Sequence, residues 1–129
     1  MPGEIALDSN ILVDLLGGNE LFGKRIQIYD VVYLPVPVLG EMLYGALIST
    51  RPEENLRRVS RIVSDTTLIP CDREVAEKFA EIKSSLRKAG TPIPETDIWI
   101  GACCIKQNVP LATRDRHFDY VEVLKKENW

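Results

Sequence analysis

The sequence predicts an α/β fold, in which helices cover both faces of a mainly parallel five-stranded sheet in a three-layer α/β/α arrangement. Short apolar runs rich in β-branched residues alternate with longer segments whose apolar residues recur at helical spacing. Most of the predicted strands are joined by connections long enough to hold a helix, as parallel pairing requires. The chain has 129 residues, of which 45% are hydrophobic and 27% charged, and this composition suits one domain with a full core.

The first half of the chain contains three predicted strands, over residues 4–7, 31–36 and 66–70. The first strand ends at Asp8-Ser9-Asn10, three residues that favour caps and turns. An apolar helical face follows over 11–16 and stops at Gly17-Gly18. Further helices are predicted over 20–29, from Val38 until Arg51-Pro52 breaks the pattern, and over 53–64.

The second half begins with a helix that Asp72 caps and Gly90 ends. A proline-broken loop over 91–94 leads into a mostly apolar helix that runs from about residue 95 to Asn108. Residues 109–113 form the predicted fourth strand, residues 114–118 a turn, and residues 121–124 a fifth strand at the edge of the sheet.

The composition narrows the possible functions. The net charge of −3 argues against a surface covered in positive potential for nucleic acid, although four acids gathered in one pocket would leave the rest of the chain nearly neutral. No apolar run reaches the roughly 18 residues of a membrane span, and the first residues lack a basic, signal-like start. The three cysteines are odd in number and are expected to be small buried residues. We therefore expect a cytoplasmic protein with no membrane partner.

Four acids occur where strands end or the next helix begins, namely Asp8, Glu41, Asp97 and Asp115. Taken singly, each has a plain explanation as a helix cap or a first-turn acid. In a parallel sheet, however, these positions share one edge, so we expect the four carboxylates to converge. Clustered carboxylates need a compensating cation, and Mg²⁺ and Mn²⁺ prefer carboxylate and water ligands. The pattern therefore favours phosphodiester hydrolysis by metal-activated water, with no side-chain nucleophile.

The four acids lie in four characteristic stretches, which are Leu-Asp-Ser-Asn-Ile-Leu (7–12), Pro-Val-Leu-Gly-Glu (37–41), Pro-Glu-Thr-Asp-Ile-Trp-Ile-Gly-Ala (94–102) and Ala-Thr-Arg-Asp-Arg-His-Phe (112–118). Together these stretches resemble PIN-domain ribonucleases, and in particular the VapC-type toxins of toxin–antitoxin pairs. The resemblance implies that residues 1–129 form a single Mg²⁺- or Mn²⁺-dependent endoribonuclease domain, homodimeric and inhibited by an antitoxin. It also implies that Asp8, Glu41, Asp97 and Asp115 are the catalytic metal-site acids. Asn10 and Thr113 would orient these acids or a bound water.

One position departs from the pattern, because many relatives carry an acid two residues beyond Asp115 and this chain has His117. Whether Asp115 contacts a metal or only orients its water therefore stays open. We expect His117 at the surface or rim of the site, since metal-bound water does not need a separate base. Arg114 and Arg116 are candidate phosphate contacts, and local ion pairs with neighbouring acids account for them equally well.

Two other functions compete with this interpretation. The first is a non-catalytic PIN-like module that binds RNA or a protein, and the complete set of acids argues against it. The second is another α/β enzyme with an aspartate after its first strand, such as a phosphoaspartyl hydrolase or a response-regulator receiver. These proteins use a second acid close to the first or a late lysine, whereas Asp8 is followed by Ser9-Asn10 and the fourth predicted strand ends in Thr-Arg-Asp.

Overall fold

Five strands form one sheet in the computed structural model, which describes residues 3–129. In spatial order they are β3 (Thr67–Ile69), β2 (Val31–Pro35), β1 (Glu4–Leu7), β4 (Leu111–Thr113) and β5 (Lys126–Asn128). Every neighbouring pair is parallel, and in the central strand Ala6 pairs with Tyr33 of β2 on one side and with Leu111 of β4 on the other. The predicted fold class is confirmed, with a sheet that is parallel throughout.

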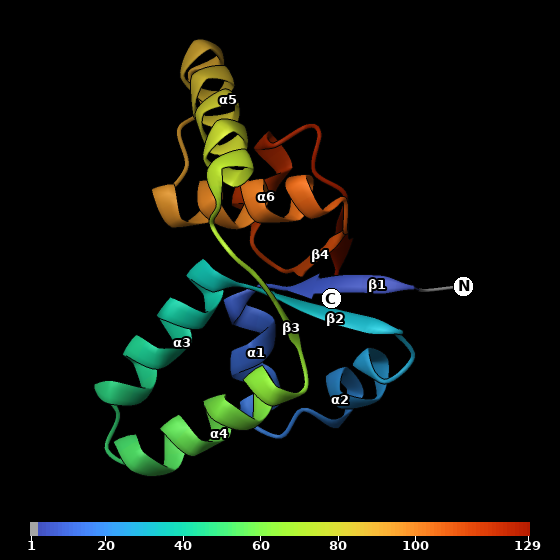
Figure 1. Ribbon diagram of the computed structural model, residues 1–129, viewed down its shortest axis with the longest axis vertical. Helices are drawn as coiled ribbons and strands as arrows, with labels where there is room; N and C mark the ends of the chain where they lie inside the picture. Colours follow the sequence, from blue (N-terminus) through green and yellow to red (C-terminus); the bar gives the residue numbers. More distant parts are fainter. Residues whose placement is uncertain (1–2) are drawn as a thin grey trace.

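Helices lie on both sides of this sheet. They are α1 (Ser9–Leu16), α2 (Glu20–Ile26), α3 (Val36–Leu47), α4 (Pro52–Ser64), α5 (Arg73–Ala89), α6 (Glu95–Gln107) and the short 3₁₀ helix η1 (Arg116–Tyr120). Figure 1 shows α5 and α6 on one side of the sheet and α1, α2 and α4 on the other. Among residues 3–129, no helix combines the length and the apolar character that crossing a membrane requires.

The strand order places a switch point beside the central strand. The chain moves outward from β1 through β2 to β3, and then returns to the other side of β1 to build β4 and β5. In open parallel sheets, ligands bind in the crevice at such a point, next to the carboxyl ends of the two strands that flank it. Here those strands are β1 and β4, which lead directly into Asp8 and Arg114.

The fifth strand does not lie where the sequence predicted it. Residues 121–124 form a turn, in which the backbone N–H of Leu124 donates to the carbonyl of Val121. Val121 and Leu124 are buried, so this apolar run packs into the core without joining the sheet. The true edge strand, β5, consists of the polar residues Lys126–Asn128. An edge strand pairs through its backbone and needs no apolar side chains, so the hydrophobic pattern missed it.

Helix boundaries follow local chemistry. Asp72 caps α5, because its side chain accepts a hydrogen bond from the N–H of Val75 at 2.9 Å. Gly90 ends that helix in the left-handed conformation, with φ of 72°. Three helices differ from the prediction by two residues or more, since α1 begins at Ser9, α2 ends at Ile26 and α3 spans Val36–Leu47.

Core packing fixes the elements around the switch point. Leu7, Ile11, Ile100 and Phe118 are at most 1% exposed, and they come from β1, α1, α6 and η1. The expectation that all three cysteines are buried is wrong for Cys71, which is exposed in the connection between β3 and α5. A residue next to the cap of a surface helix is not forced inward, whatever its hydrophobicity.

Candidate active site

Asp8 lies at the carboxyl end of β1, where it caps α1. The carboxylate is only 3% exposed and accepts two hydrogen bonds, from the N–H of Ser9 at 2.8 Å and from the hydroxyl of Thr113 at 2.7 Å. Burial raises the pKa of Asp8, although the hydrogen bonds from Thr113 and Ser9 oppose the shift. An acid this deeply buried at a switch point needs an explanation beyond its role as a helix cap.

Thr113 connects Asp8 to the second acid of the site. Its hydroxyl donates to Asp8 and accepts the backbone N–H of Asp115 at 2.9 Å. Asp115 in turn caps η1, because its side chain accepts the N–H of His117 at 2.9 Å. A continuous chain of hydrogen bonds therefore joins the ends of β1 and β4. Thr113, at its centre, is only 3% exposed.

Asp97 reaches the same place from the first turn of α6, with 14% of its side chain exposed. Its Oδ2 lies 2.9 Å from Nδ1 of His117, and the same nitrogen lies 3.0 Å from Oδ1 of Asp115. Burial raises the pKa of Asp97, the charges on Asp115 and Asp8 raise it further, and hydrogen bonding to His117 opposes the shift. Hydrogen bonding to Asp97 raises the pKa of His117, as do the charges of both acids.

Glu41 lies on α3 at the edge of this group. Burial raises the pKa of Glu41, and the negative charges of Asp8, Asp97 and Asp115 add to the shift, while hydrogen bonding to Ser9 opposes it. The charges of Asp8, Asp97 and Asp115 therefore all act on Glu41. The tightest group is smaller, because among residues 3–129 only Asp97, Asp115 and His117 have ligating atoms that all lie within 4.8 Å of one another.

The two arginines that flank Asp115 have different surroundings. Arg114 forms an ion pair with Asp14 at 2.6 Å and donates to the carbonyl of Asn10 at 3.2 Å. The ion-pair explanation therefore holds for Arg114. Both arginines are exposed and line a groove of about 380 Å³ together with Asp115.

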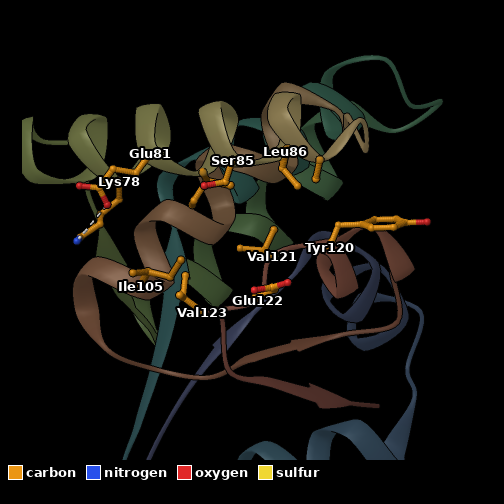
Figure 2. A pocket seen from close by; sticks show the side chains of 11 residues that line it. Lys78, Glu81, Ser85, Leu86, Ile105, Tyr120, Val121, Glu122 and Val123 are labelled. Carbon is orange, nitrogen blue, oxygen red and sulfur yellow. Dashed lines mark hydrogen bonds and ion pairs between the residues drawn. The ribbon is translucent and has the colours of Figure 1, made fainter.

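A second hollow in the molecule lies away from these acids. This groove, of about 480 Å³, lies between α5, α6, the end of η1 and residues 121–123. Figure 2 shows the side chains that line it, with Lys78 and Glu81 of α5 paired at one end, 3.5 Å apart. None of the four acids lines it. The chemistry-bearing residues are therefore concentrated at the switch point and not in this groove.

A family model described as PIN domain matches residues 5–124, which is most of the chain. The chain belongs to the PIN-domain family. The predicted resemblance is thereby confirmed at the level of the family. The PIN domain contains Asp8, Glu41, Asp97 and Asp115 within its matched residues.

Two curated relatives and one solved structure are similar to this PIN domain. It is 29% identical to Ribonuclease VapC2 of Haemophilus influenzae, over 95% of this chain and 96% of the relative. It is 25% identical to Ribonuclease VapC5 of Mycobacterium tuberculosis, over 91% of this chain and 87% of the relative. The crystal structure of VapBC2 from Rickettsia felis bound to a promoter DNA fragment matches with a TM-score of 0.91 and 22% identity, over 98% of both chains. At that identity, the structural match concerns the fold.

The residues of the PIN domain fit a divalent cation. Two carboxylates and one imidazole nitrogen converge, and Asp8 and Glu41 add negative charge nearby. Burial raises the pKa of Asp8, Glu41 and Asp97, and the charges of neighbouring acids add to each shift. A bound cation would offset the negative charge of these carboxylates.

His117 is the residue whose position the sequence did not reveal. It was expected at the rim, and with 48% of its side chain exposed it does lie there, yet its ring nitrogen sits between two of the acids. The available signal was its place two residues beyond Asp115, where the family resemblance predicts an acid. A substitution at such a position changes the donor atom and not only the charge.

Proposed function

We propose that this PIN domain, residues 1–129, is a metal-dependent endoribonuclease that hydrolyses RNA phosphodiester bonds and serves as the toxin of a type II toxin–antitoxin pair. One observation carries the proposal, which is the convergence of Asp97, Asp115 and His117 within 4.8 Å, with the buried Asp8 beside them. Support for RNA as substrate comes from the relatives named Ribonuclease VapC2 and VapC5, which match over more than nine-tenths of the chain.

Mg²⁺ or Mn²⁺ is the proposed ion, and Asp8, Glu41, Asp97 and Asp115 are the acids proposed to hold it. When bound, the ion supplies positive charge to the phosphate and lowers the pKa of the water that attacks phosphorus. Thr113 keeps Asp8 and Asp115 in their relative positions through its two hydrogen bonds. Asp97 approaches from α6, so the acids reach the site from separate elements.

Residues around the acids would position the substrate and the attacking water. Arg116 is exposed beside Asp115, which suits it to bind a substrate phosphate. Arg114 is engaged by Asp14, and we assign it to holding the turn against α1. The side-chain oxygen of Asn10 is buried and has no hydrogen-bond partner among residues 3–129. This unused acceptor supports a role for Asn10 in orienting a bound water.

The proposed partners are RNA, a cognate antitoxin and a second copy of the chain in a homodimer. The antitoxin would block RNA cleavage by covering the acidic edge or by offering a basic side chain to the carboxylates. The Rickettsia felis match supports this part of the proposal, since that crystal structure contains VapBC2 bound to promoter DNA. We assign the protein to the cytoplasm.

The test is RNA cleavage by purified protein with Mg²⁺ or Mn²⁺, using Asp8→Asn and Asp97→Asn as variants. Both should abolish cleavage and leave the circular dichroism spectrum unchanged. Asp65→Asn is the matched control, because Asp65 is an exposed aspartate at the end of α4. This variant should cleave RNA like the parent. Variants of Asp8 and Asp97 that cut RNA at the parental rate would overturn the proposal. RNA binding without cleavage by the parent would instead favour a non-catalytic module.

A further inference from the structure

We propose that His117 is a direct ligand of the divalent cation through Nδ1, and that it biases the site toward Mn²⁺ and later first-row ions over Mg²⁺. The inference rests on the proposed function, because it concerns the ion in the same pocket. Three ligating atoms carry it, namely Nδ1 of His117, Oδ2 of Asp97 and Oδ1 of Asp115. The chain contains a single histidine, so no other imidazole can bind the ion.

The spacing of these atoms fits a metal-binding corner. Neighbouring ligands of an octahedral ion lie about 3.0 Å apart when each metal–ligand bond is about 2.1 Å. Nδ1 of His117 lies 2.9 Å from Oδ2 of Asp97 and 3.0 Å from Oδ1 of Asp115. The ring nitrogen therefore lies at the distance from each carboxylate oxygen that separates neighbouring ligands of such an ion. Binding an ion here would need little change in the positions of the carboxylates.

The local fold holds the imidazole in this position. His117 belongs to the first turn of η1, and its N–H donates to Oδ1 of Asp115 at 2.9 Å. The next residue, Phe118, is fully buried and anchors η1 in the core. The imidazole itself is 48% exposed, which leaves room on its outer side for water or a phosphate oxygen.

The donor type then determines which ions are favoured. Mg²⁺ prefers oxygen ligands and rigid octahedral coordination, whereas imidazole nitrogen suits the later first-row ions. A neutral histidine with its proton on Nε2 leaves the Nδ1 lone pair free to bind a metal. Replacing this nitrogen by a carboxylate oxygen should therefore shift the preference back toward Mg²⁺. Asp97 and Asp115 supply the oxygen ligands in either case.

The test uses pulsed electron paramagnetic resonance of Mn²⁺ bound to the full chain, purified without a histidine tag. We expect modulation from a directly bound imidazole ¹⁴N, and we expect labelling with ¹⁵N-histidine to replace that modulation by the ¹⁵N pattern. His117→Asp should remove it. Competition titrations should show the ratio of Mn²⁺ to Mg²⁺ affinity falling about tenfold or more in His117→Asp. Labelling leaves the sequence unchanged, so the result does not depend on how a variant folds.

Two outcomes would overturn the inference, and they can be told apart. Mn²⁺ that binds without histidine nitrogen modulation, with the same ion preference in His117→Asp and His117→Gln, would mean that His117 only forms an ion pair with the acids. The proposed nuclease would survive that result. Failure of Mn²⁺ to bind the parent at all would overturn both the inference and the metal requirement of the proposed function.

Discussion

Replacing Asp97 by Asn should have opposite effects on stability with and without metal. Ligating oxygens of Asp97 and Asp115 lie within 4.8 Å of each other. Two unit charges at that distance repel by about 3 kcal/mol at an effective dielectric constant of about 20. The side chains are 14% and 31% exposed, so water and salt should reduce the relief gained in the variant to about 1 kcal/mol. The asparagine oxygen can still accept from His117, so little hydrogen bonding is lost.

Added Mn²⁺ should reverse the order of stability. An ion present at about 100 times its dissociation constant stabilises the folded protein by about 2.7 kcal/mol, which is on the order of 10 °C in melting temperature for a domain of this size. Loss of one ligand that weakens binding about tenfold would halve that gain. Thermal melts at about pH 8 with and without Mn²⁺ measure both effects. If Asp97→Asn melts lower than the parent without metal and gains the full Mn²⁺ increment, Asp97 is not a ligand.

Three further predictions concern the neighbours of the acids. Thr113→Val should lower the free energy of unfolding by about 2 kcal/mol and abolish cleavage, because two buried hydrogen bonds are lost. Thr113→Ser keeps the hydroxyl and should behave like the parent in denaturant melts. Arg116→Ala should weaken RNA binding in a salt-dependent manner with little change in stability, whereas Arg114→Ala should cost up to about 1 kcal/mol of stability by removing the ion pair with Asp14. The Mn²⁺ increment in melting temperature should grow between about pH 5 and about pH 7.5, because the ion displaces protons that the site binds.

The sign of that pH dependence follows from the direction of the pKa shifts. Burial raises the pKa of Asp8, Glu41 and Asp97, and hydrogen bonding to Asp97 raises that of His117. A group with a raised pKa in the folded state contributes stability at low pH that is lost as the pH rises through that pKa. The metal-free protein should therefore lose stability from these groups as the pH rises, while the metal-bound protein should not. Equal Mn²⁺ increments at both pH values would contradict this account.

The sequence predicts those elements whose side chains are buried, because their apolar residues recur with the period of the helix or strand. The strands β1 to β4 are apolar and were predicted close to their positions, while the polar edge strand β5 was not, because its pairing involves only backbone groups. The four acids are predicted to meet because parallel strands share one edge; in the structure Asp97 and Asp115 lie close together, and Thr113 links Asp8 to Asp115.

Side chains of the turn after β4 could not be predicted in the same way. Arg114 and Arg116 are two residues apart with the same chemistry and are both exposed, and only the folded turn determines that Arg114 pairs with Asp14. The position of His117 between two carboxylates likewise depends on how η1 packs through Phe118. Periodicity carries no information about such contacts, because they join a short irregular segment to distant elements.

The most direct test of the account is the chemistry of the RNA ends that the purified protein produces. Hydrolysis by metal-activated water with departure of the 3′ oxygen predicts 5′-phosphate and 3′-hydroxyl ends, formed with Mg²⁺ or Mn²⁺ and absent when a chelator is added. Mass spectrometry of a short RNA after cleavage distinguishes these ends from all others. Products with 2′,3′-cyclic phosphates, or cleavage that persists in the chelator, would contradict the claim that the acids of this PIN domain work through a bound divalent ion.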